Sequence, residues 1–346
     1  MEAKVSPSIA RKKALLLAGG PVKIPADFRL PFHASRSTAG PGAGSVSMVF
    51  SFGNTRAKKA VSRDAGDFEL VEKDGRLAIL EGGKSFIEDV ELTPTLLHAP
   101  FQAFVNLDHE CVLNCKFCAS PRLEKSVTKD LTDAKIIESI MEASKRRDFK
   151  AVAFTSAVPE TANITVTRMA GLVRAIRSRL PDAPIGVEPY VTRPDEVELL
   201  KDAGAEEIKL NIESFDPEIF EKVCPNRDYD SILHSINHAC EVFGKNRVCS
   251  NIIFGLGETD DTVLEGVKVL ANMGAVVTLR SLRLNRYNLA ELEKALGRLD
   301  PVDAERMLRL AKGEKRILKE YGLTTLAFRT MCHSCLSCDI VPFWDV

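Results

Sequence analysis

The sequence lacks several features that would assign it to a class at once. No run of about 18 apolar residues occurs in the 346 residues, so no transmembrane helix is expected. Lysine and arginine nearly balance aspartate and glutamate, and the formal net charge of −1 predicts neither a nucleic-acid nor a membrane partner. The apolar run Ala14–Ala18 is too short for a signal-peptide core, so a short amphipathic helix is expected near the start.

Neither an internal repeat nor a complete phosphate-binding motif is present. The glycine-rich segment Ser37–Ser45 lacks the Gly-Lys-Ser/Thr ending of a P-loop. We expect a structural loop there, with a ligand-contacting loop as the alternative.

Two regions differ in their hydrophobic pattern, and they predict two domains. Residues 1–97 are interpreted as a small β-rich N-terminal lead-in, because Asp74-Gly75 marks a hairpin between Phe68–Glu72 and Leu77–Leu80, and Lys84–Leu92 fits a third strand. Residues 98–346 alternate apolar strands with amphipathic helices, which predicts an α/β fold with a parallel sheet.

The second region predicts a complete or nearly complete (β/α) barrel. Strands are expected at Ala103–Leu107, Ala151–Thr155, Ile185–Val187, Ile208–Ile212, Val248–Phe254, Val276–Leu282 and Thr324–Phe328. Helices are expected at Asp133–Lys145, Thr165–Arg179, Asp195–Ala203, Tyr229–Phe243, Thr262–Met273 and Ala304–Glu320. Because such barrels carry their chemistry at the C-terminal ends of the strands, residues that follow the strands are candidates for the site.

The nine cysteines are concentrated in two triplets, one within Cys111–Cys118 and one within Cys332–Cys338. Tight triplets in a long chain without a signal peptide favour metal sites over disulfides, which indicates a reducing compartment, by default the cytoplasm. Each triplet follows an expected strand, the first and the last, so both should face the same mouth of the barrel. Cys224, Cys240 and Cys249 stand alone.

The first triplet has the spacing Cys111-x3-Cys115-x2-Cys118, with Phe117 just before the last cysteine. Thiolates suit iron–sulfur clusters or zinc. Three thiolates on a four-iron cube leave one iron open to a chelating substrate. The alternative is structural zinc, for which His109 would be the fourth ligand.

This triplet resembles the signature of the radical S-adenosylmethionine (SAM) superfamily. The resemblance implies a barrel of the radical SAM type and a 4Fe–4S cluster whose open iron binds SAM, which is cleaved to a 5′-deoxyadenosyl radical. It also implies that the backbone at Phe117 contacts adenine.

Two later segments are similar to biotin synthase. Lys209–Ser214 resembles its Asn-Leu-Asp-Thr segment, which implies a SAM or substrate contact for Asn211 and a ribose contact for Glu213; alternatively, Glu213 caps the helix that begins near Asp216. Arg247–Thr259 resembles a second segment, and Gly255, Gly257 and Glu258 are interpreted as cofactor-binding residues. Cys249 matches an auxiliary-cluster ligand of that family, but a buried core cysteine is an equal alternative.

The second triplet, Cys332-x2-Cys335-x2-Cys338, is compact enough to hold one auxiliary 4Fe–4S cluster. The candidate fourth ligands are Cys249, His333, Ser337, Asp339 and Arg329. A zinc clip that holds the C-terminal segment in place is the alternative.

Together these features favour a radical SAM enzyme that inserts sulfur at an unactivated C–H carbon, as biotin and lipoyl synthases do. The chain resembles the archaeal two-component lipoyl synthases, which implies an electron donor such as ferredoxin or flavodoxin, an acyl carrier protein substrate and a second radical SAM protein. One alternative makes the second cluster an electron relay or a substrate anchor in a peptide- or cofactor-modifying enzyme. Another is a zinc-stabilised binding module. The polar residues expected near the mouth are Ser156, Asn211, Arg280, Arg283, Asn285 and Tyr287.

Overall fold

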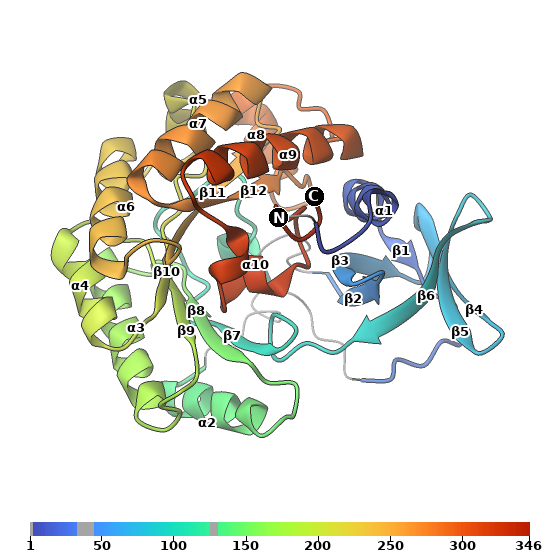
Figure 1. Ribbon diagram of the computed structural model, residues 1–346, viewed down its shortest axis with the longest axis horizontal. Helices are drawn as coiled ribbons and strands as arrows, with labels where there is room; N and C mark the ends of the chain where they lie inside the picture. Colours follow the sequence, from blue (N-terminus) through green and yellow to red (C-terminus); the bar gives the residue numbers. More distant parts are fainter. Residues whose placement is uncertain (1–2, 33–44, 125–130) are drawn as a thin grey trace.

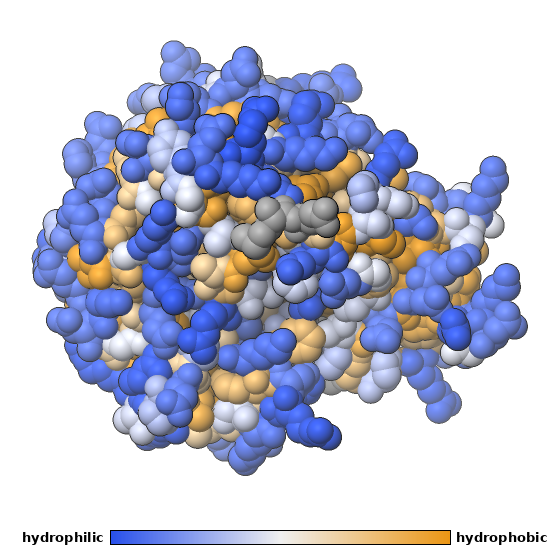
Figure 2. Space-filling model, in the orientation of Figure 1, coloured by the Kyte–Doolittle hydropathy of each residue, from blue (hydrophilic) through white to orange (hydrophobic). Residues whose placement is uncertain are grey.

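The computed structural model describes residues 3–32, 45–124 and 131–346, and it contains two β structures with helices around the larger one (Figure 1). Most of the glycine-rich segment Ser37–Ser45 lies outside the described residues. None of the described helices is long and apolar enough to cross a membrane. Figure 2 shows a mainly hydrophilic face, on which hydrophobic residues gather most visibly over the N-terminal β structure at the right.

The N-terminal β structure is a closed barrel, preceded by helix α1 (Pro7–Ala18). Its strands run in the order β1-β3-β2-β6-β5-β4 around the barrel. Their bounds are β1 (Val22–Lys23), β2 (Ser47–Phe52), β3 (Thr55–Ser62), β4 (Phe68–Lys73), β5 (Arg76–Glu81) and β6 (Lys84–Thr93). The expected hairpin is present between β4 and β5, because Asp74 and Gly75 both adopt the positive φ that a two-residue turn requires.

The second β structure is a six-stranded parallel sheet in chain order from β7 to β12. Its strands are β7 (Gln102–Asn106), β8 (Ala151–Thr155), β9 (Ile185–Glu188), β10 (Glu207–Lys209), β11 (Val248–Phe254) and β12 (Val276–Ser281). Every residue of β11 is buried, as expected for a strand covered on both faces. The α/β fold class is confirmed.

Helices follow the strands and cover the outer face of this sheet (Figure 1). They are α2 (Asp133–Ser144), α3 (Ala162–Arg177), α4 (Pro194–Asp202), α5 (Pro217–Val223), α6 (Tyr229–Phe243), α7 (Asp260–Met273), α8 (Leu289–Leu296) and α9 (Ala304–Glu320). Threonine or aspartate side chains accept a backbone N–H at the starts of most of them, for example Thr161 before α3 and Asp303 before α9. Such caps explain why the expected helix bounds match closely.

The seventh expected strand, Thr324–Phe328, is wrong. Residues Thr325–Ala327 form a 3-10 turn. The hydroxyl of Thr324 accepts the N–H of Leu326, and the Thr325 hydroxyl donates to the carbonyl of Pro342. The described parallel sheet therefore ends at β12 with six strands, which is consistent with a nearly complete barrel, although the sheet does not close.

The chain after this turn enters the interior of the sheet and does not follow a strand. Gln102, Gly186 and Glu207 lie at the beginnings of β7, β9 and β10 on the face that also lines the cavity described below, as alternation along each strand requires. The Gln102 side chain exchanges hydrogen bonds with the backbone of Met331, and Glu207 accepts the N–H groups of Arg329 and Thr330. Helix α10 (Met331–Cys335) therefore starts at the end of the sheet where the strands begin (Figure 1).

Candidate functional site

A cavity of about 310 Å³ opens at the C-terminal ends of the parallel strands. Its lining includes all six cysteines of the two triplets: Cys111, Cys115, Cys118, Cys332, Cys335 and Cys338. The two triplets reach it by different routes. The first follows β7, as expected, but the second does not follow a strand end; it rises through the interior from α10. Both triplets therefore lie at the same mouth, as expected, but the expectation that the second triplet follows a strand is wrong.

The loop of the first triplet is held by backbone and side-chain hydrogen bonds. Arg122 donates to the carbonyls of Cys115 and Cys118, and the Cys111 sulfur accepts the N–H of Val158 at 3.5 Å. Burial raises the pKa of the Cys118 thiol to about 11, and negative charge at Cys115 and Cys111 adds to this shift. Three thiolates on this loop therefore repel one another unless a cationic centre lies between them.

Cys224, at the end of α5, is a site residue that the sequence reasoning missed. Its buried thiol is hydrogen-bonded to Cys115, and this bond is the largest cause that lowers the pKa of Cys115. The backbone joins the same two segments, because Lys116 donates its N–H to the carbonyl of Val223. A lone cysteine 109 positions beyond Cys115 gives no sequence signal for this contact.

Glu213 and Asn211 line the cavity where β10 ends. Glu213 has a φ of +66°, and its carboxylate lies 3.4 Å from the buried guanidinium of Arg227. The capping alternative for Glu213 is wrong, because Asp216 itself accepts the N–H groups of Glu218 and Ile219. Burial raises the pKa of Glu213, while Arg227 opposes that shift. Asn211 donates to Glu188 at 2.8 Å.

The turn after β11 contains the three residues that the sequence pattern indicates as cofactor-binding. Gly255, Gly257 and Glu258 are absent from its lining. Glu258 accepts the N–H groups of Gly255 and Leu256 at 2.7 and 2.8 Å and pairs with Arg306, so its carboxylate holds the turn itself. Gly257 has a φ of +113° and open space where a side chain would begin. A cofactor contact at Gly255, Gly257 or Glu258 stays a prediction.

Phe117 lines the cavity, and its carbonyl accepts a hydrogen bond from Asn288 at 3.0 Å. His109 does not line the cavity, and its Nδ1 lies 3.0 Å from the amide nitrogen of Asn106. Within the described ranges, no three His, Cys, Asp or Glu side chains converge on a point that would hold a single metal ion.

The second triplet is surrounded by buried cations. Lys209 and Arg280 both donate to the Cys332 sulfur, at 3.3 and 3.2 Å. Burial opposes the charge on Lys209, but Cys332 and Glu188 outweigh it and raise its pKa. Arg283 donates to the carbonyl of Cys338. Burial raises the pKa of the Cys335 thiol and raises that of Cys338 to about 11, while Arg56 and Arg280 oppose these shifts.

The candidate fourth ligands differ in their positions. Arg329 is wrong, because its side chain is largely exposed and pairs with Glu206. His333 is buried, with Nε2 near Thr278 and Val277, and burial lowers its pKa to about 3. Asp339 pairs with Arg280 at 3.2 Å and lines a separate small void. Ser337 lines the cavity.

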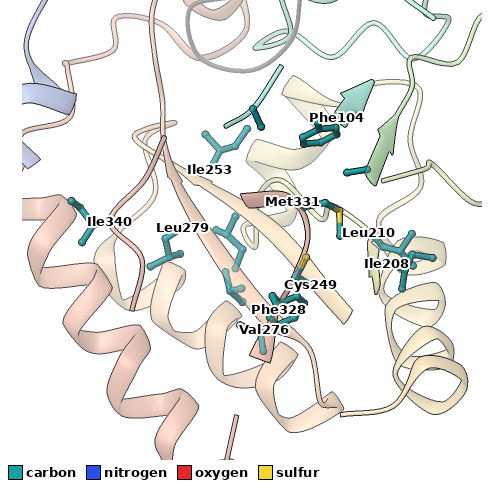
Figure 3. Packing of buried hydrophobic residues seen from close by; sticks show 14 of the residues in the cluster. Phe104, Ile208, Leu210, Cys249, Ile253, Val276, Leu279, Phe328, Met331 and Ile340 are labelled. Atoms are coloured by element: carbon teal, nitrogen blue, oxygen red, sulfur yellow. The ribbon is translucent and has the colours of Figure 1, made fainter. Parts of the chain in front are cut away.

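Cys249 belongs to the core. It is 2% exposed and lies on β11 below the cavity, where Figure 3 shows it beside Phe328. Burial raises the pKa of its thiol well above the usual range. These observations favour the core alternative.

Four of the expected mouth residues besides Asn211 line the cavity: Ser156, Arg280, Arg283 and Asn285. Tyr287 does not; its ring lies 4.7 Å from the guanidinium of Arg286. Arg280 and Arg283 are not exposed salt-bridge residues, because both contact the second triplet.

Comparison with known proteins identifies one family. Residues 105–270 match the family model described as "Radical SAM superfamily". A biotin synthase from Thermotoga petrophila is 27% identical over 166 residues, which are 47% of this chain and 54% of that protein. A lipoyl synthase from Kocuria rhizophila is 27% identical over 175 residues, 49% of this chain and 50% of that protein. The chain thus spans between half and two thirds of the length of such relatives.

Solved structures show the same fold at low identity. Methylornithine synthase (PylB) has a TM-score of 0.50 and 18% identity, covering 64% of this chain and 69% of that one. The FeFe-hydrogenase maturase HydG from Carboxydothermus hydrogenoformans has a TM-score of 0.51 and 20% identity, covering 63% of this chain and 52% of that one. These structures share the fold of the parallel sheet and its helices. The family-model match identifies residues 105–270 as a radical SAM domain, and the triplet Cys111, Cys115 and Cys118 lies within that domain at the mouth of the sheet.

Proposed function

We propose that this protein is a radical SAM enzyme with two iron–sulfur clusters, and that it inserts sulfur at an unactivated C–H carbon. The observation that carries the proposal is that both cysteine triplets line one cavity. A substrate carbon in that cavity would lie between them. Distant similarity to biotin and lipoyl synthases supports the same reaction class.

The first triplet would hold a 4Fe–4S cluster through Cys111, Cys115 and Cys118. When bound, that cluster with SAM supplies a 5′-deoxyadenosyl radical. Glu213 would bind the ribose, since a carboxylate accepts hydrogen bonds from two neighbouring hydroxyls. Arg227 lies 3.4 Å from the Glu213 carboxylate and opposes the rise that burial causes in its pKa. The backbone at Phe117 and Gly257 would contact the rest of the cofactor.

The second triplet would hold an auxiliary cluster through Cys332, Cys335 and Cys338. What supports this is the chemistry of the donor set, because three sulfur ligands share one cavity and the Cys332 sulfur accepts hydrogen bonds from Lys209 and Arg280. Ser337 is the candidate fourth ligand that shares the cavity. An electron donor such as ferredoxin or flavodoxin, an acyl carrier protein substrate and a second radical SAM protein complete the proposal for a lipoyl-synthase-like sulfurtransferase.

Sulfur insertion can be tested by labelling the clusters with a heavy sulfur isotope and following the label into the product. Protein reconstituted anaerobically with heavy sulfide would be given SAM, reductant and a medium-chain acyl group on a carrier protein. We expect one thiolated product that carries the heavy label, and a degraded auxiliary cluster after a single turnover. Both clusters surviving many turnovers, or unlabelled product, would instead support an electron relay or substrate anchor.

A further inference from the structure

The N-terminal β-barrel directs two cations toward the second triplet. Along β3, Thr55, Ala57 and Lys59 are buried inside the small barrel, so Arg56 and Lys58 lie on its outer face. An outward lysine or arginine on a strand normally extends into water. Here that face of β3 packs against the C-terminal segment that carries the second triplet.

Hydrogen bonds hold Lys58 through its backbone and its side chain, and Arg56 through its side chain. The N–H of Lys58 donates to the carbonyl of Ser337 at 2.6 Å, and its ammonium group donates to the carbonyl of His98 at 3.0 Å. Arg56 reaches the carbonyl of Cys335 and stacks 4.7 Å from the centre of the Phe101 ring. Burial lowers the pKa of Lys58, and negative charge at Cys338 and Cys335 opposes that shift.

Around the second triplet, the buried cations outnumber the nearby carboxylates. The cations are Arg56, Lys58, Lys209, Arg280 and Arg283, and the carboxylates near them are Asp339 and Glu188. Glu213 also lies near Lys209 and Arg280, but it pairs with Arg227. Asp345 is also near Arg56, but it pairs with Lys13 at 2.6 Å, and both of those side chains are fully buried. The surplus cations thus demand anions, which three thiolates can supply.

We propose that Arg56 and Lys58 complete a cationic enclosure around Cys332, Cys335 and Cys338, and that this enclosure raises the reduction potential of the cluster bound there. The proposal rests on the proposed function for the presence of that cluster. A buried positive charge stabilises each negative charge that a reduced cluster gains, and its effect is strong because little water screens it. The small barrel is therefore part of the redox site and not only a lead-in.

The experiment uses the full chain with Cys111, Cys115 and Cys118 changed to alanine, so that the auxiliary cluster alone gives the signal. Lys58→Met removes the charge and keeps the aliphatic stem. Arg56→Gln in the same chain removes the second charge. After anaerobic reconstitution, a redox titration followed by electron paramagnetic resonance would measure the midpoint potential. We expect a negative shift for Lys58→Met and a larger one for the double variant.

Lys73→Met is the matched control, since Lys73 is exposed on β4 of the same barrel. It should leave the midpoint potential where it is. If Lys58→Met binds no cluster, Lys58→Arg decides: a cluster with the original potential supports the charge effect, and loss of iron in both variants overturns it. An intact cluster with an unmoved potential in the double variant also overturns the inference. Absence of a second cluster in the parent protein would instead refute the proposed function.

Discussion

The loop with Cys111, Cys115 and Cys118 is held by residues of the radical SAM domain, whereas Cys332, Cys335 and Cys338 are held from three sides. Arg122, Val158 and Cys224 contact the first loop. The second triplet rises from α10 inside the sheet and is contacted by β10, β12 and the β3 strand of the other barrel. The second triplet is thus contacted from both β structures, whereas the contacts named for the first loop come from the part of the chain that carries the parallel sheet.

The two triplets also differ in the balance of charged side chains around them. Near the first triplet, the buried Arg227 is paired with Glu213, which leaves little surplus charge. Around the second triplet, five cations exceed the nearby carboxylates. This difference suggests that the first site leaves room for a small cofactor, while the second stabilises negative charge on a bound group.

The strongest test of the comparison removes one triplet at a time. Changing Cys111, Cys115 and Cys118 to alanine should remove about half of roughly eight iron atoms per chain and abolish SAM cleavage. The same change at Cys332, Cys335 and Cys338 should remove the other half and leave 5′-deoxyadenosine formation. Iron, labile sulfide and nucleoside analysis would measure this. Cys240→Ala is the control; stoichiometric zinc without labile sulfide would contradict both expectations.

Arg280→Met tests the charge surplus. It leaves Asp339 buried without its partner and removes a donor to Cys332, so we expect about 3–5 kcal/mol lower free energy of unfolding and less iron at the second site. Urea unfolding monitored by circular dichroism would measure the change. Arg309→Met, which breaks the exposed pair with Asp260, should cost at most about 1 kcal/mol. If the two variants lowered the free energy of unfolding equally, the buried pair of Arg280 and Asp339 would contribute no more than an exposed pair.

Glu314→Leu tests the cost of a buried carboxylate on α9, near Asp339 of the second site. Neither carboxylate oxygen of Glu314 meets a donor among the described residues, and burial, with Asp339 nearby, raises its pKa well above the usual range. Above about pH 4.5 the folded state binds more protons here than the unfolded state, so this group lowers stability as pH rises toward its folded pKa. We expect Glu314→Leu to raise the free energy of unfolding at pH 7 by about 1–3 kcal/mol.

The gain from Glu314→Leu should shrink as the pH falls toward about 4.5 and stay at its smallest value below that pH, where the carboxyl is protonated in both states. Glu320→Leu, at the exposed end of the same helix, should show no such pH dependence. A lower stability of Glu314→Leu at neutral pH would mean that the carboxylate has a partner in solution.

Glu213→Gln tests the first site with the smallest expected effect. It keeps the size of the side chain but removes a charged acceptor, so SAM affinity should fall roughly tenfold, about 1.4 kcal/mol. Iron content should stay constant, and Glu218→Gln on exposed α5 should bind SAM normally. Isothermal titration would measure both dissociation constants, and an unchanged value for Glu213→Gln would remove the ribose role.

Local patterns predicted the parallel sheet well, because burial and capping act over a few residues. The bounds of β11 and α9 match the ranges expected from the hydrophobic pattern, and the structure adds the Asp303 cap at the start of α9. Thr324–Phe328 also has a strand-like composition, but hydroxyl bonds from Thr324 and to Pro342 give the chain a turn instead. The division into residues 1–97 and 98–346 stays a prediction.

The site was predictable where its spacing is local and not where it depends on distant partners. The cysteine triplets are visible as short motifs, and the common cavity was expected. Cys224 beside Cys115 and Lys58 beside Ser337 join residues that are far apart in the chain, and period or propensity carries no information on such contacts.

The buried pair of Lys13 and Asp345 has a consequence for assembly. These residues are 332 positions apart, and Lys13 also donates to the carbonyl of Leu336 within the second triplet. Contacts of such long separation form late, because the loop they close is costly in entropy. We expect the first triplet to be able to accept iron while the second is still unformed, so that time-resolved iron uptake during refolding would show two phases, with the faster one lost in the Cys111, Cys115 and Cys118 alanine variant.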